Sequence, residues 1–250
     1  MTKTGVMRLE PAGPVGEGLE PMEVDPSGFA PGSDVPEQSI HAYFADESIG
    51  LTVGVWTTTG MTEKPGPYPG DEFMYLLEGR LDMVDGDGEA VPVERGQSFA
   101  VRNGIPVSWT QEAPFLKKFF LLLHDEKKPV PDIDSAKGGV VVMDPMALEA
   151  KLEPEAENIG GGEQRDALAF TNDAGTMTVG MWETTPFETE KAPFSVHEFC
   201  QILEGEAVIT DEDGTEHRFG PGEVLFIPKG TVCSWKCDVP LRKYYAIVDM

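Results

Sequence analysis

The sequence is poor in positive charge and has no long apolar run. Its 250 residues include 19 lysines and arginines against 44 aspartates and glutamates, for a formal net charge of −25. A polyanion lacks the Lys/Arg-to-phosphate contacts on which nucleic-acid binding rests, and an acidic membrane surface repels it. The longest apolar run, residues 119–123, is too short to cross a bilayer. We therefore predict neither a nucleic-acid partner nor a membrane partner.

Cysteine and histidine are also scarce. The three cysteines, Cys200, Cys233 and Cys237, have no zinc-finger spacing, and no two of the four histidines have a metal-ligand spacing. Residues 1–18 are polar and rich in proline and glycine, unlike a signal peptide, so we predict a cytoplasmic protein. No nucleophile elbow, phosphate-binding loop or dinucleotide fingerprint is present. We interpret the acidity as a solubilising coat, with attraction of a cationic substrate as the alternative.

What the sequence does contain is an internal repeat. Trp56 lies in TVGVW and Trp182 in TVGMW, and 182 − 56 gives an offset of 126 residues. The same offset relates the Leu-Glu-Gly strings at 77–79 and 203–205, and the halves align without a gap over 53–123, with roughly 20 identities. This pattern predicts two domains related by duplication. Residues 1–130 would form an N-terminal arm plus a first barrel, and 131–250 a linker or arm plus a second barrel.

The repeating unit has the pattern of β-structure. Short apolar segments alternate with Gly-containing bends, as in MYLLEGRLDMV and CQILEGEAVIT, which is typical of a sandwich or barrel. Helix is scarce, and 145–152 is the best candidate. We expect the first 40 residues to form an extended arm that packs on a neighbouring barrel. The fold class predicted from these patterns is all-β.

Two spacings resemble the motifs of the cupin superfamily (RmlC-like jelly rolls). Glu72 to Gly79 and Glu198 to Gly205 have the E-x6-G spacing, and 222–230 follows the G-x5-P-x-G pattern of the second motif. The strings around them are similar to the cupin group that includes ethanolamine-utilisation Q-type and ureidoglycine aminohydrolase-like proteins. The resemblance implies a bicupin: two tandem cupin barrels of the double-stranded β-helix, or jelly-roll, type.

The chain departs from the family at the positions of the metal ligands. The first-motif histidines are replaced by Pro65 or Gly66 and Pro67 or Tyr68 in the first half, and within 191–194 in the second. The second-motif histidine is replaced by Val107 and Cys233. Since a catalytic divalent metal generally needs three protein ligands, we predict no metal and no other cofactor. Any metal would lie in the second barrel near Glu198 and Cys233.

Several residue types at duplicated positions are candidates for a site inside the barrels. The resemblance points the two motif glutamates inward, and a buried carboxylate needs a counter-charge. We hypothesise pairs of these glutamates with Lys117 and Lys243; the alternative is that both lysines face solvent.

The four tryptophans form either an aromatic ligand wall or core packing. Cys200 and Cys233 form with Glu198 either a thiol–carboxylate site or a set of small buried apolar groups. The predicted ligand-pocket residues are Trp56, Tyr68, Glu72, Trp109, Lys117, Trp182, Phe194, Glu198, Cys200, Cys233, Trp235 and Lys243.

Three functions are compatible with these features. The first is a bicupin without the usual histidine metal site that binds a small molecule in metabolism or sensing. The second, by resemblance to ureidoglycine aminohydrolase-like cupins, is an enzyme acting on a small polar metabolite in the second barrel, with Glu198 as candidate general base. The third is a purely structural bicupin with filled barrels. The two barrels are expected to pair within the chain, and a homodimer is a further expected assembly.

Overall fold

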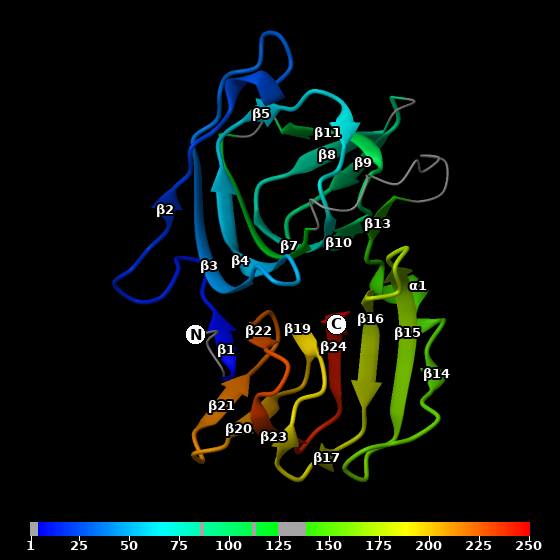
Figure 1. The fold of residues 1–250 in the computed structure, drawn as a ribbon. Coiled ribbons are helices and arrows are strands. Elements are labelled where there is room, and N and C mark those ends of the chain that lie inside the picture. The colour runs from blue at the N-terminus through cyan, green and yellow to red at the C-terminus, as the bar shows by residue number, and fades with distance from the viewer. Residues whose placement is uncertain (1–4, 86–87, 112–113, 125–138) are drawn as a thin grey trace. The chain divides into compact units, whose positions relative to one another are not determined.

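The structure is a computed structural model that describes residues 5–85, 88–111, 114–124 and 139–250 (Figure 1). It is almost entirely β, as predicted, and divides into two units. We call Glu10–Met143 the N-terminal barrel, and Met1–Leu9 together with Asp144–Met250 the C-terminal barrel. The predicted domain boundary at 130/131 lies outside the described residues.

Each barrel consists of a seven-stranded and a five-stranded antiparallel sheet. The order in the N-terminal barrel is β13-β10-β7-β12-β4-β3-β2 in the larger sheet and β5-β11-β8-β9 in the smaller, with β6 paired to β11. The strands are β2 (Glu20–Pro21), β3 (Gln38–Asp46), β4 (Leu51–Thr58), β5 (Met61–Thr62), β6 (Gly66–Pro67), β7 (Asp71–Glu78), β8 (Leu81–Asp85), β9 (Ala90–Val93), β10 (Ser98–Val101), β11 (Pro106–Gln111), β12 (Leu116–Leu123) and β13 (Val140–Val142), with a 3-10 turn at Pro26–Gly28.

The C-terminal barrel repeats this order, as β1-β22-β19-β24-β16-β15-β14 and β17-β23-β20-β21, with β18 paired to β23. The predicted helix forms as the short α1 (Pro145–Glu149), which the Asp144 side chain caps by accepting hydrogen bonds from two backbone amides. The strands are β1 (Met7–Leu9), β14 (Glu153–Pro154), β15 (Gln164–Thr171), β16 (Met177–Thr184), β17 (Phe187–Glu188), β18 (Ala192–Pro193), β19 (His197–Glu204), β20 (Ala207–Asp211), β21 (Glu216–Phe219), β22 (Val224–Ile227), β23 (Val232–Cys237) and β24 (Leu241–Val248).

The first strand of the chain belongs to the C-terminal barrel. β1 pairs with β22, although the residues that follow it build the N-terminal barrel. The equivalent strand of the second half, β13, pairs with β10 of the N-terminal barrel. Each half therefore contributes an edge strand to the sheet formed mainly by the other half. Of the arm expected over the first 40 residues, only β1 pairs with the C-terminal barrel, whereas β2 pairs with β3 inside the N-terminal barrel.

The predicted gapless alignment of the two halves over 53–123 was wrong for the closing strand, because the first half has one extra residue before it. The interval from the end of β11 to the start of β12 is 116 − 111 = 5 positions, whereas from β23 to β24 it is 241 − 237 = 4. The equivalent of Lys243 is consequently Lys118, whose neighbour on β7 is Leu76, just as Ile202 is the neighbour of Lys243 on β19. The offset of 126 residues thus changes to 125 in the closing strand.

Both barrels turn sharply where the E-x6-G motif ends. Gly79 and Gly205 have φ angles of +86° and +81°, a region that side-chain-bearing residues rarely adopt. A Cβ at Gly205 would lie 2.3 Å from the carbonyl oxygen of Pro240, on the segment that leads into the closing strand. The glycines therefore let this turn approach the closing segment, which aligns β24 beside β19.

Among the residues that the structure describes, no helix has the length and apolarity that a bilayer crossing requires.

Candidate ligand-binding site

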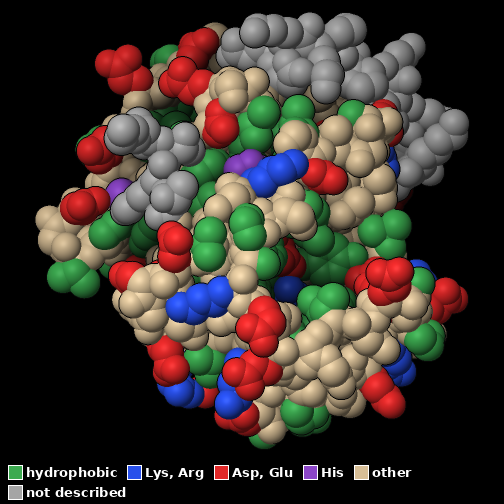
Figure 2. Space-filling model, turned by 60° about the horizontal axis from the view of Figure 1, so that its bottom comes forward, with side chains coloured by type: hydrophobic (Ala, Val, Ile, Leu, Met, Phe, Trp, Pro, Cys, Tyr) green, Lys and Arg blue, Asp and Glu red, His purple; other side chains and the backbone are tan. Residues whose placement is uncertain are grey.

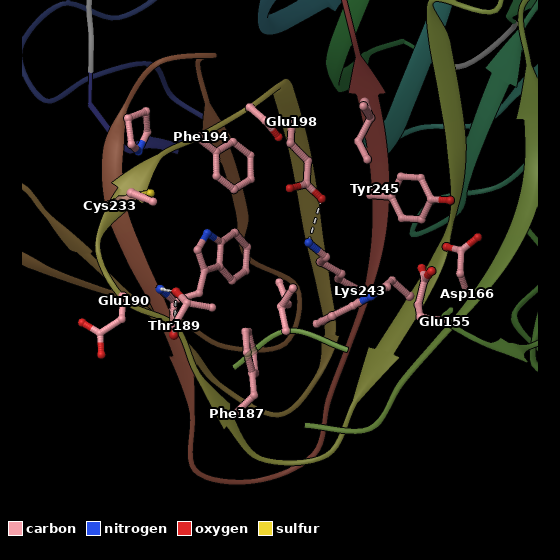
Figure 3. A pocket seen from close by; sticks show the side chains of 17 residues that line it. Glu155, Asp166, Phe187, Thr189, Glu190, Phe194, Glu198, Cys233, Lys243 and Tyr245 are labelled. Atoms are coloured by element: carbon pink, nitrogen blue, oxygen red, sulfur yellow. Dashed lines mark hydrogen bonds and ion pairs between the residues drawn. The ribbon is translucent and has the colours of Figure 1, made fainter. Parts of the chain in front are cut away.

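A carboxylate and an ammonium group meet inside the C-terminal barrel (Figure 3). Glu198 on β19 and Lys243 on the adjacent β24 are both buried, and the Lys243 Nζ donates to the Glu198 Oε1 at 2.7 Å. The same Nζ lies 4.9 Å from the ring centroid of Trp182 and 4.5 Å from that of Trp235. The ammonium group is therefore neutralised by one carboxylate and flanked by two aromatic faces, which attract cations electrostatically.

The N-terminal barrel contains the same arrangement. The Lys118 Nζ donates to the Glu72 Oε1 at 2.7 Å and lies 4.9 Å from the ring centroids of both Trp56 and Trp109. The hypothesis of a buried Glu–Lys pair thus holds in both barrels, but the prediction of Lys117 as the partner was wrong. Lys117 is partly exposed and lies 3.4 Å from Glu78 instead. The longer turn before β12 shifts the register by one residue, and a one-residue shift reverses the face on which a strand residue points.

Charge and burial act against each other at Lys243. Burial by itself lowers the pKa of the ammonium group, but the interactions of Lys243 with the Cys200 side chain and with the negative charge of Glu198, hydrogen bonds included, outweigh burial and raise it. Burial places the pKa of Cys200 well above the ordinary thiol value, and the charge of Glu198 adds to the effect. Lys243 therefore stays a cation and Cys200 a neutral thiol near neutral pH. Neither has the lowered pKa of a nucleophile.

A cavity of about 430 Å³ adjoins this ion pair in the C-terminal barrel. Figure 2 shows a hollow in which hydrophobic side chains surround an acidic and a basic group. Six predicted pocket residues line the cavity: Trp182, Phe194, Glu198, Cys233, Trp235 and Lys243. Cys200 is fully buried beneath them, where its Sγ accepts from the Lys243 Nζ at 3.7 Å. The volume falls in the usual range for small-molecule sites, which are mostly apolar with a few placed polar groups.

The sequence did not reveal several polar residues of the cavity wall. Glu155 follows β14, Asp166 lies on β15 and Tyr245 on β24, and all three line the cavity together with Thr189 and Glu190. Burial raises the pKa of Asp166, while a hydrogen bond from Tyr245 and the charge of Lys243 oppose the rise. Burial and the charge of Asp166 raise the pKa of Glu155. Neither acidic residue lies in the repeated motifs, so no sequence signal placed them at this site.

Polar groups inside the N-terminal barrel have more partners within the protein. The Tyr68 hydroxyl donates to Glu72, and Phe194 occupies the equivalent position in the other barrel. The Trp109 indole N–H donates to the Gln111 side chain at 3.3 Å. Glu63 adds a further carboxyl group, whose pKa is raised by burial and lowered in part by Lys118. Tyr68, Glu72 and Trp109 therefore already have hydrogen-bond partners within this barrel.

The chemistry at the two motif glutamates does not fit a metal ion. Each carboxylate already accepts a hydrogen bond from a lysine ammonium group at 2.7 Å, and a metal ligated there would lie beside that positive charge. Within the described ranges, no three His, Cys, Asp or Glu side chains come together as a ligand set. His197, although adjacent to Glu198, accepts from the Lys229 backbone amide through its Nδ1 at 3.2 Å.

The paired jelly-roll sheets, with a motif glutamate pointing into each barrel, have the architecture of the cupin fold. Residues 171–245 match the sequence profile of the EutQ-like cupin domain, which covers most of the C-terminal barrel. This match identifies residues 171–245 as similar to a EutQ-like cupin domain, and the N-terminal barrel has the same strand order. No curated protein sequence matches it.

Solved structures of low sequence identity share the fold. A DUF861-family protein of unknown function from Pseudomonas syringae pv. tomato is 23% identical with a TM-score of 0.76, and the match covers 98% of this chain and 100% of that one. Ylba from E. coli, also of the DUF861 family, is 14% identical with a TM-score of 0.55 over 99% and 93% of the chains. A salicylate 1,2-dioxygenase from Pseudaminobacter salicylatoxidans is 11% identical with a TM-score of 0.57 over 84% and 76%. These likenesses concern the fold, which hosts many chemistries.

Proposed function

We propose that this protein is a bicupin that binds a small molecule in its C-terminal barrel, with a lysine ammonium group in the place of a metal ion. The observation that carries the proposal is the buried Glu198–Lys243 pair at the cavity of about 430 Å³. A fixed positive charge between two indole rings gives the barrel a permanent internal cation, and the cavity beside it leaves room for a ligand. The proposed role is binding in small-metabolite metabolism or sensing.

The cavity favours binding over the purely structural alternative, in which side chains fill both barrels. The enzymatic alternative has less support, because Glu198 already accepts a hydrogen bond from a cation and no thiol in the site has a lowered pKa. An enzyme that used Glu198 as a general base would lose activity in Glu198→Gln, which keeps the shape of the side chain and removes its charge.

Elemental analysis tests the absence of a metal. We expect protein purified without added metal, and protein incubated with manganese, iron, nickel or zinc and then dialysed, to contain far less than one ion per chain. A transition metal retained at full occupancy, and lost in Glu198→Gln, would overturn the proposal.

Intrinsic fluorescence tests ligand binding in the same barrel. Trp182 lines the cavity, while Trp56 occupies the equivalent place in the N-terminal barrel, so the two provide a matched pair of variants. In a screen of small polar metabolites we expect a ligand whose fluorescence change is reduced in Trp182→Phe and retained in Trp56→Phe. Ligand signals that depend only on Trp56 would place the site in the other barrel and contradict the proposal.

A further inference from the structure

We infer that the ligand of the C-terminal barrel is a small organic amine that also carries a hydrogen-bond acceptor, such as a carbonyl oxygen. This inference rests on the proposed function, because it concerns the ligand class of the same cavity. Three differences between the two barrels support it, and each involves residues at equivalent positions.

The first difference points to an acceptor on the ligand. Trp235 lines the cavity and is only 6% exposed, and among the described residues its indole N–H has no hydrogen-bond partner. Its counterpart Trp109 donates to Gln111, a position that Cys237 occupies in the C-terminal barrel. An unpaired buried donor costs about 1–3 kcal/mol. A ligand oxygen in the cavity would satisfy this donor as the Gln111 side chain does for Trp109.

The second difference points to a positive charge on the ligand. Glu155 and Asp166 lie next to one another at the cavity (Figure 3). Strand pairing places Ile40 at the position of Asp166, opposite Trp56 as Asp166 is opposite Trp182. Met22 takes the position of Glu155: each follows its short edge strand and donates its backbone N–H to the equivalent carbonyl. The acid pair is therefore specific to the C-terminal barrel.

The third difference concerns the donor to the motif glutamate. Glu72 accepts from the Tyr68 hydroxyl as well as from Lys118, whereas Phe194 has no hydroxyl to offer Glu198, whose second donor is the weaker thiol of Cys200. The cavity wall thus leaves acceptor capacity at Glu198, Glu155 and Asp166. A protonated amine supplies up to three donors and relieves the repulsion between the neighbouring carboxylates.

The charge balance of the wall agrees with this assignment. Four carboxylates line the cavity (Glu155, Asp166, Glu190 and Glu198) against a single cation, Lys243, which is paired with Glu198. Among the described residues, Glu155, Asp166 and Glu190 form no ion pair, and Asp166 accepts a hydrogen bond from the Tyr245 hydroxyl. Five aromatic side chains complete the wall: Trp182, Phe187, Phe194, Trp235 and Tyr245. Aromatic faces combined with carboxylates that have no cationic partner favour an organic cation over an anion.

Three probes that differ in one group each test the inference by calorimetry. Phenylalanine amide carries both an ammonium group and a carbonyl, 3-phenylpropanamide lacks the ammonium group, and phenethylamine lacks the carbonyl. We expect phenylalanine amide to bind at least about tenfold more tightly than either of the others, which corresponds to roughly 1.4 kcal/mol. Binding of 3-phenylpropanamide at equal or higher affinity, or no measurable binding of phenylalanine amide, would overturn the inference.

Substitution of cavity residues by their equivalents from the N-terminal barrel tests which residues cause the preference for each group of the probe. The double variant Glu155→Met with Asp166→Ile should abolish the preference for the ammonium group, and Cys237→Gln should reduce the preference for the carbonyl by giving Trp235 an internal partner. Glu157→Gln with Glu212→Gln removes two exposed charges from the same barrel and serves as the control that keeps both preferences. An ammonium preference that survives the first double variant contradicts the inference.

The outcomes for the ligand class and for the proposed function are distinct. If the neutral probe binds best in the C-terminal barrel, the amine assignment fails and the small-molecule-binding function stands. A metal ion held at full occupancy at Glu198, by contrast, would contradict both the proposed function and the amine assignment.

Discussion

The N-terminal and C-terminal barrels share one buried arrangement and differ in what surrounds it. Each contains a glutamate, a lysine and two tryptophans with nearly the same distances. Around Glu72 the N-terminal barrel adds a phenol, Tyr68, as second donor. Around Glu198 the C-terminal barrel has Phe194, which has no hydroxyl to donate. The difference teaches that the ion pair belongs to the common framework of both barrels, while the proposed ligand specificity rests on a few residues beside it.

Removal of either buried lysine should have the largest effect. Lys118→Ala and Lys243→Ala should each lower the free energy of unfolding by about 3–5 kcal/mol, because a buried carboxylate loses its counter-charge. Lys117→Ala, a control one residue away, should cost less than about 1 kcal/mol, since its partner Glu78 is exposed. Denaturant unfolding with fitted m-values measures all three. A cost for Lys117→Ala as large as that for Lys118→Ala would contradict the corrected register.

Exchanging the residues at positions 68 and 194 should have the next largest effect. Tyr68→Phe removes a hydrogen bond to a charged group and should destabilise the N-terminal barrel by about 2 kcal/mol. Phe194→Tyr should add that hydrogen bond at Glu198, stabilise the C-terminal barrel by about 1 kcal/mol and weaken amine binding by occupying the free acceptor. Thermal unfolding and calorimetry check the two parts. Unchanged amine binding in Phe194→Tyr would separate Glu198 from the ligand site.

The acid pair of the C-terminal barrel should give a smaller, pH-dependent effect. The folded state raises the pKa of Asp166 and Glu155, so it binds more protons than the unfolded state just above their ordinary pKa values. Stability should therefore fall as pH rises from about 3.8, the ordinary aspartate pKa, through the raised values. Asp166→Asn should flatten this dependence and gain less than about 1 kcal/mol at neutral pH, because both groups are partly solvated. Unfolding measured across this pH range in both proteins is the test, and an unchanged slope in the variant would be the contrary result.

Thiol labelling should show the smallest effect. Burial raises the pKa of Cys233, which lines the cavity, to about 11, so at pH 8 about one thiol in a thousand is ionised. We expect slow reaction of all three cysteines with a thiol reagent in the native protein and complete reaction in denaturant. Rapid native labelling that disappears in Cys233→Val, the residue type of the N-terminal barrel, would favour the thiol–carboxylate site instead.

The internal repeat predicts the site residues that the two barrels share, but not those that differ between them. The motif glutamates and the four tryptophans occupy repeated positions, so a shared interior arrangement was predictable from the sequence. The lysine that pairs with Glu72 was not predictable, because residues 117 and 118 are both lysines and only strand pairing shows which one faces inward. Glu155 and Asp166 lie outside the repeated motifs, and their equivalents Met22 and Ile40 are apolar. No comparison of the halves could therefore mark them.

By itself, the sequence determined the all-β architecture, the repeated barrel and the inward glutamates, because these depend on local alternation, turn residues and motif spacing. The tertiary structure decided which lysine neutralises Glu72 and which carboxylates line the cavity beside the Glu198–Lys243 pair. Those features depend on strand register and on side chains brought together from distant strands. A one-residue difference in a single turn changes the face on which every following residue of the strand lies.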